Sequence, residues 1–259
     1  MKRGLYRAQA IILNSFDYGE SDRIIAFYTL EHGKIKGIAK GARRSKKRFV
    51  GNLEPGSLIN LIFFQSGGSE LVRVEDVTLV EGFHRLRADI DTLSYGFYLL
   101  ELTSEMTREG VVLPAVYELL AGMLKMLNDG HGPGVVARFF EIRLLSLAGY
   151  MPHLSGCVVC KNDGTDGPVR KFSSEKGGVV CGRCAPGLNS LLPISPSTAG
   201  LLSMAARMDA DKLARLKPAQ SFIEEGERLL YDFIKFQLGR ELKTRRFMEK
   251  MRAIETRAL

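Results

Sequence analysis

The sequence predicts an α+β protein in which an all-β unit precedes a helical unit. Within the first 80 residues apolar positions gather in short β-rich runs, and at 34–39 they alternate with charged or small residues, which is the period of a half-exposed β-strand. From about Phe83 they recur at helical spacings instead. All four cysteines of the 259-residue chain lie in one Gly-rich segment, about 153–190. We therefore predict domains at 1–81 and 82–259, with the cysteine segment as an insert in the second.

The N-terminal unit is predicted to contain five short strands. They are expected at 6–13, 23–30, 34–39, 57–65 and 70–80. Pro55-Gly56 breaks the chain before the fourth strand, and Ser66-Gly67-Gly68-Ser69 is expected to join the last two as a hairpin. Because closure removes exposed strand edges, five strands of this size favour a small barrel. The five-stranded oligonucleotide-binding (OB) fold is the barrel that we expect.

The second unit is predicted to be helical. Helices are expected at 94–108, 114–128, 135–147, 196–208, 218–238 and 242–255. Pro114 suits the first turn of the second of these, and Gly149 follows the end of the third. No apolar run reaches the roughly 20 residues needed to cross a bilayer, and the N-terminus lacks the pattern of a signal peptide. We expect a cytoplasmic protein with no membrane partner.

The cysteines form two C-x-x-C pairs, Cys157 with Cys160 and Cys181 with Cys184, separated by twenty residues. Each pair directs two thiolates at one ion, so the four sulfurs complete a tetrahedral shell for zinc. Such a closed shell holds a fold together and leaves no open position for a substrate. A pair of disulfides is the alternative, although a reducing compartment favours metal.

Positive charge is concentrated at the two ends of the chain. The net charge is +8, with +5 in residues 1–80, +5 in residues 235–259 and −2 between them. Two basic ends favour a polyanionic partner such as nucleic acid. The simpler alternative is that the positive charge only keeps the protein soluble. The stretch 235–246 mixes apolar and basic residues. Either this stretch binds an acidic peptide tail, or it forms a terminal helix that docks on the core.

The densest cluster of basic residues lies at 34–48, where no acidic residue occurs. Its members, which we predict to bind DNA, are Lys34, Lys36, Lys40, Arg43, Arg44, Lys46, Lys47 and Arg48. Eight like charges contribute nothing to a core, although an ordinary solvated face is the alternative. On a small barrel such a segment can follow a nucleic-acid backbone. Among the nearby aromatic residues, Phe49 is our preferred candidate for stacking on bases.

Several blocks of sequence, in this order, resemble the RecO family. They are Tyr18-Gly19-Glu20-Ser21-Asp22, Phe27-Tyr28-Thr29, Gly33-Lys34, Ala39-Lys40-Gly41-Ala42-Arg43-Arg44-Ser45, Leu53-Glu54-Pro55-Gly56, Phe140-Glu141, Leu144-Leu145, Gly149-Tyr150 and Pro152. The resemblance spans most of the chain and rests on the succession of the blocks. It implies an N-terminal OB domain, a helical domain and a zinc insert with a structural role.

The resemblance also implies a function. RecO-like proteins are bacterial recombination mediators that bind single- and double-stranded DNA, anneal complementary strands and help load recombinase at gaps. Their partners are RecR and the acidic C-terminal tail of single-stranded DNA-binding protein, and a nucleoid-associated location follows. The eight basic residues fall in the family's DNA-binding region, whereas no residue here is assigned to the tail pocket.

Two other functions remain open from the sequence. One is a metal-dependent nucleic-acid enzyme, a nuclease or modifying enzyme, which requires an open coordination position at the cysteines. The usual motifs for phosphate-binding loops, zinc proteases and serine hydrolases are absent. The other is an RNA-binding accessory protein, because OB barrels accept either nucleic acid. Strand cleavage by the pure protein would favour the first, and competition between matched DNA and RNA strands addresses the second.

Overall fold

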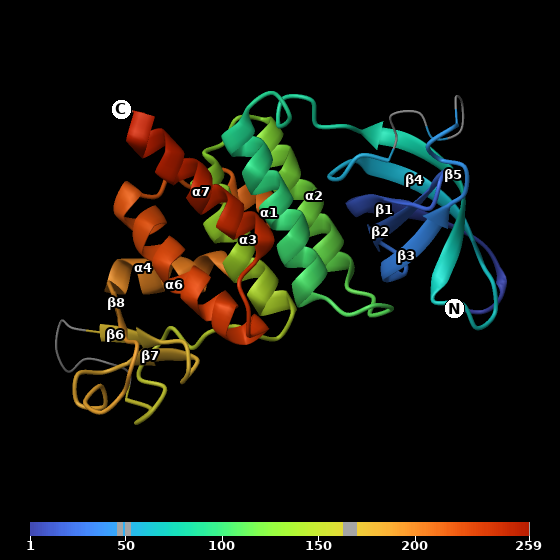
Figure 1. Ribbon diagram of the computed structural model, residues 1–259. Helices are drawn as coiled ribbons and strands as arrows, with labels where there is room; N and C mark the ends of the chain where they lie inside the picture. Colours follow the sequence, from blue (N-terminus) through green and yellow to red (C-terminus); the bar gives the residue numbers. More distant parts are fainter. Residues whose placement is uncertain (46–48, 50–52, 163–169, 259) are drawn as a thin grey trace. The chain divides into compact units, whose positions relative to one another are not determined.

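The computed structural model describes residues 1–45, 49, 53–162 and 170–258, with side chains as far as Ile254. The chain divides into two compact units, Met1–Gly130 and His131–Leu259 (Figure 1). The domain boundary predicted after residue 81 stays a prediction. Within the described ranges, every helix is too short or too polar to cross a membrane.

The first unit begins with a closed five-stranded barrel. Its strands are β1 (Gly4–Tyr18), β2 (Asp22–Thr29), β3 (Gly33–Ala39), β4 (Leu58–Gln65) and β5 (Leu71–Glu81). Their order around the barrel is β1-β2-β3-β5-β4, and β4 closes onto β1. Neighbours are antiparallel except β3 and β5, which run parallel. The five predicted strands and their barrel are confirmed.

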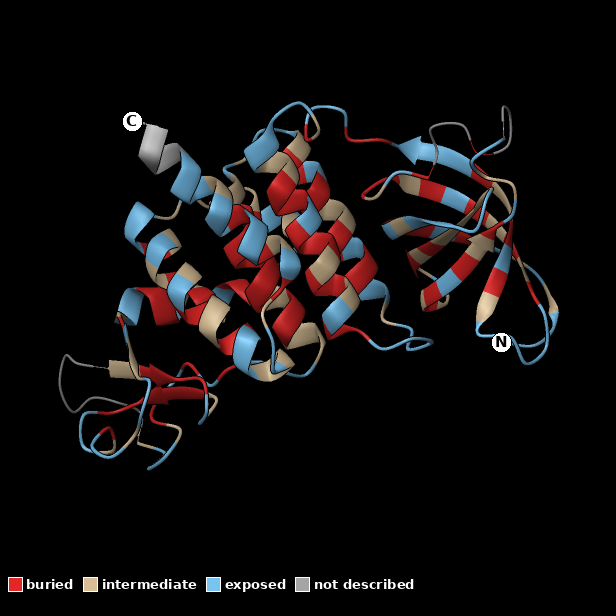
Figure 2. Ribbon diagram, in the orientation of Figure 1, coloured by how far each residue is buried: buried red, intermediate tan, exposed pale blue. Residues whose placement is uncertain are grey.

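Alternation along the strands builds the barrel core, as the red and blue bands of Figure 2 show. Ile25, Phe27, Ile35 and Phe63 point inward and are almost fully buried. Phe49 comes from the connection between β3 and β4 and joins the same cluster. This segment therefore contributes to the core as well as carrying charge.

Two helices complete the first unit, α1 (Ile90–Met106) and α2 (Pro114–Asn128). Asp89 caps α1 by accepting a hydrogen bond from the Thr92 amide at 2.7 Å, which explains why the helix begins before the predicted residue 94. At the other end of α1, the Lys34 ammonium donates to the carbonyl oxygens of Ser104 and Thr107 at 2.5 Å each. A side chain from a barrel strand thus donates hydrogen bonds to carbonyl oxygens that have no partner within the helix.

The second unit contains five helices and a small sheet within the described residues. The helices are α3 (Pro133–Leu147), α4 (Pro196–Ala205), α5 (Ala210–Leu213), α6 (Gln220–Leu238) and α7 (Lys243–Ala258). The sheet consists of β6 (Arg170–Ser173), β7 (Gly178–Val180) and β8 (Leu192–Ile194), in the order β7-β6-β8. The four helices predicted in this part of the chain are present, whereas the sheet and α5 were not predicted.

A buried ion network fixes α3, α6 and α7 to one another. Arg138 of α3 is 1% exposed and donates to Glu141, which is fully buried. Glu227 of α6 lies 3.8 Å from Arg138 and accepts from Arg245 at 2.5 Å and Arg252 at 2.8 Å, both on α7. Arg245 is therefore part of the helix packing, as expected for a terminal helix that docks on the core.

Gly33 lies where the barrel closely approaches the connection from α1 to α2. Its φ is +65°, and a Cβ there would lie 2.0 Å from the Val111 carbonyl oxygen. Gly41 has nearly the same φ, +67°, with no atom within 4 Å of its Cβ position. A substitution at either glycine therefore strains the backbone equally, but only a side chain at position 33 also clashes with the Val111 carbonyl.

We predict that Gly33→Ala destabilises the protein much more than Gly41→Ala. Left-handed backbone costs an alanine about 1–2 kcal/mol at either position. The clash with Val111 adds roughly 1–3 kcal/mol at position 33 alone. Urea unfolding followed by circular dichroism measures the difference. Equal losses of unfolding free energy in the two variants would show that the barrel does not depend on this contact.

Candidate metal centre and basic surface

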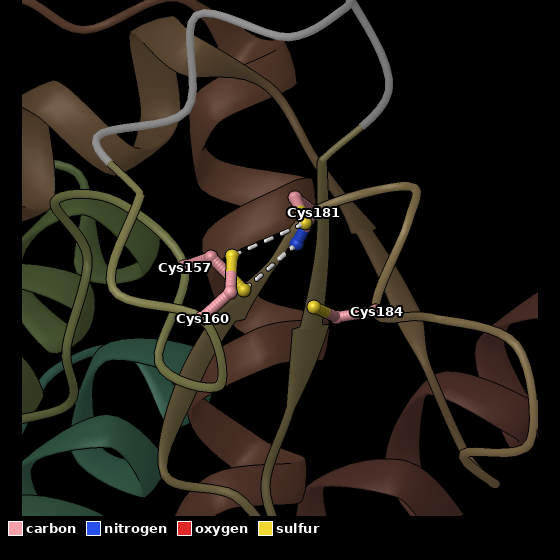
Figure 3. A group of neighbouring side chains, drawn as sticks. All are labelled: Cys157, Cys160, Cys181 and Cys184. Atoms are coloured by element: carbon pink, nitrogen blue, oxygen red, sulfur yellow. Dashed lines mark hydrogen bonds between the residues drawn. The ribbon is translucent and has the colours of Figure 1, made fainter.

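The four cysteine sulfurs lie together, as Figure 3 shows, although they come from two separate turns. All four Sγ atoms are within 4.8 Å of one another, and those of Cys160 and Cys181 are 3.8 Å apart. A tetrahedral shell with sulfurs about 2.3 Å from zinc separates the sulfurs by about 3.8 Å. The four thiols are unbridged. The spacing fits a shared metal ion better than disulfides, whose sulfurs are about 2.05 Å apart.

Tight turns and the small sheet bring the cysteines together. Lys161 adopts a φ of +62° and donates its amide to the Cys157 carbonyl at 2.9 Å, which closes the first turn. Cys181 directly follows β7, and the Cys184 amide donates to its carbonyl at 3.1 Å. The Cys181 amide in turn points at the Cys157 sulfur at 3.4 Å (Figure 3). Each pair is thereby preorganised to aim two sulfurs at one point.

The cysteine segment is anchored to α6. The Phe172 ring of β6 packs edge-on against Phe233, with ring centroids 5.7 Å apart. Ser174 donates a hydrogen bond to Asp232 at 2.6 Å. The segment's own apolar cluster is small and includes Cys157, Val180 and Cys181. The segment therefore depends on its sulfurs and on α6 for its shape.

The thiols differ in acidity. Burial alone would raise the pKa of Cys157, but the backbone amides of Cys160, Cys181 and Val159 lower it to about 6. The pKa of Cys184 rises to about 12, chiefly through its hydrogen bond with the Cys181 sulfur and also through burial. Like charges at such short range resist full ionisation unless a cation shares them. The donor set therefore suits a divalent ion that binds thiolates.

The first members of the basic cluster turn toward the protein. Lys34 is half-buried against the end of α1, and burial lowers its pKa. Lys36 forms a 2.6 Å ion pair with Glu109 but keeps half of its side chain exposed. The Lys34 ammonium is thus engaged by the end of α1 and is not part of the exposed basic surface.

The later described members of the basic cluster lie at the β1–β2 turn, which Arg43 and Arg44 contact. We call Lys40, Arg43 and Arg44 the basic turn. The Arg43 amide donates to the Ser21 carbonyl at 3.0 Å, and its guanidinium lies 3.2 Å from Asp17. Arg44 lies 3.6 Å from the exposed carboxylate of Glu20. The remaining predicted DNA-binding residues, Lys46, Lys47 and Arg48, lie outside the described residues.

The structure corrects the choice of aromatic residue. Phe49 is only 4% exposed because its ring fills the barrel core, so our expectation that it stacks on bases was wrong. Phe27 and Tyr28 are fully buried as well. Phe16 and Tyr18, near the end of β1, are the exposed aromatic residues beside the basic turn. Burial of Phe49 was not visible in a sequence that flanks it with Arg48 and Val50.

Comparison with known proteins identifies the family. A model described as Recombination protein O N terminal matches residues 1–83, and one described as Recombination protein O C terminal matches residues 87–246. A DNA repair protein RecO from Anaeromyxobacter sp. (strain K) is 36% identical over 93% of this chain and 94% of its own.

Two further relatives carry the same printed name, DNA repair protein RecO. The one from Syntrophus aciditrophicus (strain SB) is 32% identical over 96% of this chain and 97% of its own. The one from Myxococcus xanthus (strain DK1622) is 33% identical over 95% of this chain and 98% of its own. Since two successive models and relatives of matching length cover most of the sequence, the chain belongs to the RecO family of DNA repair proteins.

Proposed function

We propose that this chain is a non-enzymatic DNA-binding mediator of recombination in DNA repair. It binds single- and double-stranded DNA, anneals complementary strands, and helps load recombinase on gaps coated with single-stranded DNA-binding protein. Its partners are RecR and the acidic tail of that protein, and its place in the cell is with the nucleoid. The observation that carries the proposal is an exposed basic turn on a five-stranded barrel in a member of the RecO family.

The basic turn supplies the electrostatic part of this function. Arg43 and Arg44 are exposed and held in place by Asp17 and Glu20. Exposed ion pairs of this kind are worth only about 0–1 kcal/mol, so phosphates can replace the carboxylates at little cost. Binding then releases the counterions of the DNA. Neutralised phosphates also let two complementary strands approach each other, which annealing requires.

The metal has a structural role in this proposal, and we propose that it is zinc. Four thiolates complete its shell and leave no position for a water or a substrate. Zinc would therefore hold the cysteine segment on α6 and take no part in DNA chemistry. Reproducible strand cutting by the pure protein, with zinc or magnesium added, would contradict this division of roles.

We predict that replacing Arg43 and Arg44 together by alanine weakens DNA binding and lowers its salt dependence. Each lost phosphate contact removes about 0.7–0.9 from the slope of log affinity against log salt. The slope should fall by about 1.5 for two contacts. The matched control is Arg215→Ala with Lys217→Ala, which removes two exposed charges from the helical unit. Fluorescence anisotropy over a salt series gives both quantities.

The proposal for the basic turn fails if the Arg43 and Arg44 variant keeps the wild-type affinity and slope. It also fails if the control variant changes both as much, because charge anywhere on the surface would then account for binding. Repeating the series with a matched RNA strand shows which nucleic acid is preferred. Tighter binding of RNA would overturn the assignment to DNA.

We predict that Cys184→Ser removes the metal without removing DNA binding. Bound zinc should fall from one per chain to well below one, measured by elemental analysis. Hydrogen exchange should rise in residues 153–162 and 170–194, because the sulfurs no longer hold the segment. Val159→Ser changes an exposed residue between two cysteines and serves as the control. Full metal content in Cys184→Ser would refute the site, and a large loss of DNA affinity would refute its purely structural role.

We predict that the protein anneals complementary strands coated with single-stranded DNA-binding protein, and that annealing slows when the acidic tail of the coating protein is deleted. A fluorescence-quenching assay on labelled strands measures the rate. Naked strands are the control, since deletion of the tail cannot affect them. Equal rates with both forms of the coating protein would exclude the tail as a partner.

A further inference from the structure

Two large aromatic side chains are exposed on one face of β1. Phe16 is 50% exposed and Tyr18 is 54% exposed. Residues two apart on a strand point to the same side, so the two rings project together. Elsewhere in the barrel Phe27, Tyr28 and Phe63 are fully buried. The exposed pair contributes little to the core of the barrel, and its rings are available to contact a ligand.

The strand that carries these rings has an open edge. β4 pairs with β1 only from Gly4 to Ile11, whereas β2 pairs with it as far as Tyr18. Within the described residues, the last part of β1 and the start of β2 form a ribbon whose open edge is β1, while β3 pairs with the other edge of β2. The face of this ribbon that carries Phe16 and Tyr18, together with the open edge of β1, is accessible to an extended ligand.

The basic turn lies against the other face of the same ribbon. Asp17 is between the two aromatic residues and points the opposite way. Its carboxylate contacts Arg43 at 3.2 Å and Arg23, its cross-strand neighbour, at 3.4 Å. Arg44 contacts Glu20 in the turn that ends the ribbon. A ligand that crosses the open edge of β1 therefore meets aromatic rings on one side and guanidinium groups on the other.

We propose that Phe16 and Tyr18 stack on the bases of a single nucleic-acid strand whose phosphates lie on the basic turn. The proposal rests on the DNA-binding function proposed above and adds that this site prefers a single strand to a duplex. Base faces are accessible in a single strand but are covered by their neighbours in a duplex. Stacking on aromatic rings therefore selects single strands and does not depend on sequence.

Charge complementarity favours a nucleic acid over a protein partner for this face. A protein that covered only the two rings would leave the adjacent guanidinium groups without a role, whereas a nucleotide offers a flat apolar base and an anion at once. The combination of aromatic rings and a basic groove is the usual basis of single-strand recognition by barrels of this size.

The test combines two substitutions with the removal of bases. The Phe16→Leu, Tyr18→Leu double variant keeps charge and apolar character but removes both rings. The probes are a single-stranded thymidine oligonucleotide, the same length with abasic positions at its centre, and a duplex. Leu5→Ala, at the other end of β1, alters an exposed apolar residue away from the basic turn and is the control. Thermal unfolding confirms that each variant is folded.

We expect the double variant to bind the thymidine strand at least about fivefold more weakly, because stacking contributes about 1–3 kcal/mol per base. Its salt slope should match that of the wild type, since no phosphate contact is lost. The loss should disappear on the abasic strand and on the duplex. Leu5→Ala should bind all three probes as the wild type does.

Three results would overturn the inference. Unchanged affinity for the thymidine strand would exclude stacking, as would an equal loss on the abasic strand. A changed salt slope would show that the rings act through the basic turn. If the Arg43 and Arg44 variant still loses affinity, the DNA-binding function survives and only the stacking fails. If neither variant has an effect, the proposed DNA-binding role of the basic turn fails together with the stacking.

Discussion

The contact between Lys34 and the last turn of α1 determines how the first unit is built. Its ammonium ion satisfies two carbonyl oxygens at the negative end of a helix, and its own carbonyl accepts the Gly110 amide at 3.0 Å. Gly33, one residue earlier, allows the Val111 carbonyl to approach. Strand β3 is therefore joined to α1 and to the connection that leads into α2. Because these helices pack on the barrel, the first compact unit extends to Gly130.

The same lysine shows where sequence analysis reaches its limit. Short β-rich runs of apolar residues, bounded by turn residues, predicted all five strands of the barrel, because such runs are a local property of the chain. Charge counting located the basic cluster for the same reason. However, Lys34 and Arg43 are indistinguishable in sequence, and only the packing of a helix 70 residues away separates a capping lysine from an exposed arginine. Phe49 was misjudged similarly, since its burial depends on strands distant in sequence.

In the second unit, local chemistry was predictable and tertiary packing was not. Two C-x-x-C pairs predicted a four-sulfur cluster because the ligands of a turn are set by adjacent residues. The three-stranded sheet that aligns the pairs escaped prediction, since strands of three or four residues are too short to show a period. Arg138 and Glu141 lie within a predicted helix, yet nothing in its pattern shows that both are buried or that Arg138 also lies near Glu227. A buried pair is costly to desolvate unless such partners are present.

The basic residues discussed above thus serve three purposes, and only one of them leaves charge available to a polyanion. Arg138 and Arg245 hold helices together, Lys34 caps α1, and the basic turn faces solvent. The net charge of +8 therefore overstates what is available to a polyanion. Asp17 and Glu20 reduce the local charge further, but Asp17 and the Ser21 carbonyl also position Arg43 before a ligand arrives. Side chains that are ordered in advance lose less entropy on binding, so a small number of well-placed arginines can bind DNA more effectively than a larger number of mobile ones.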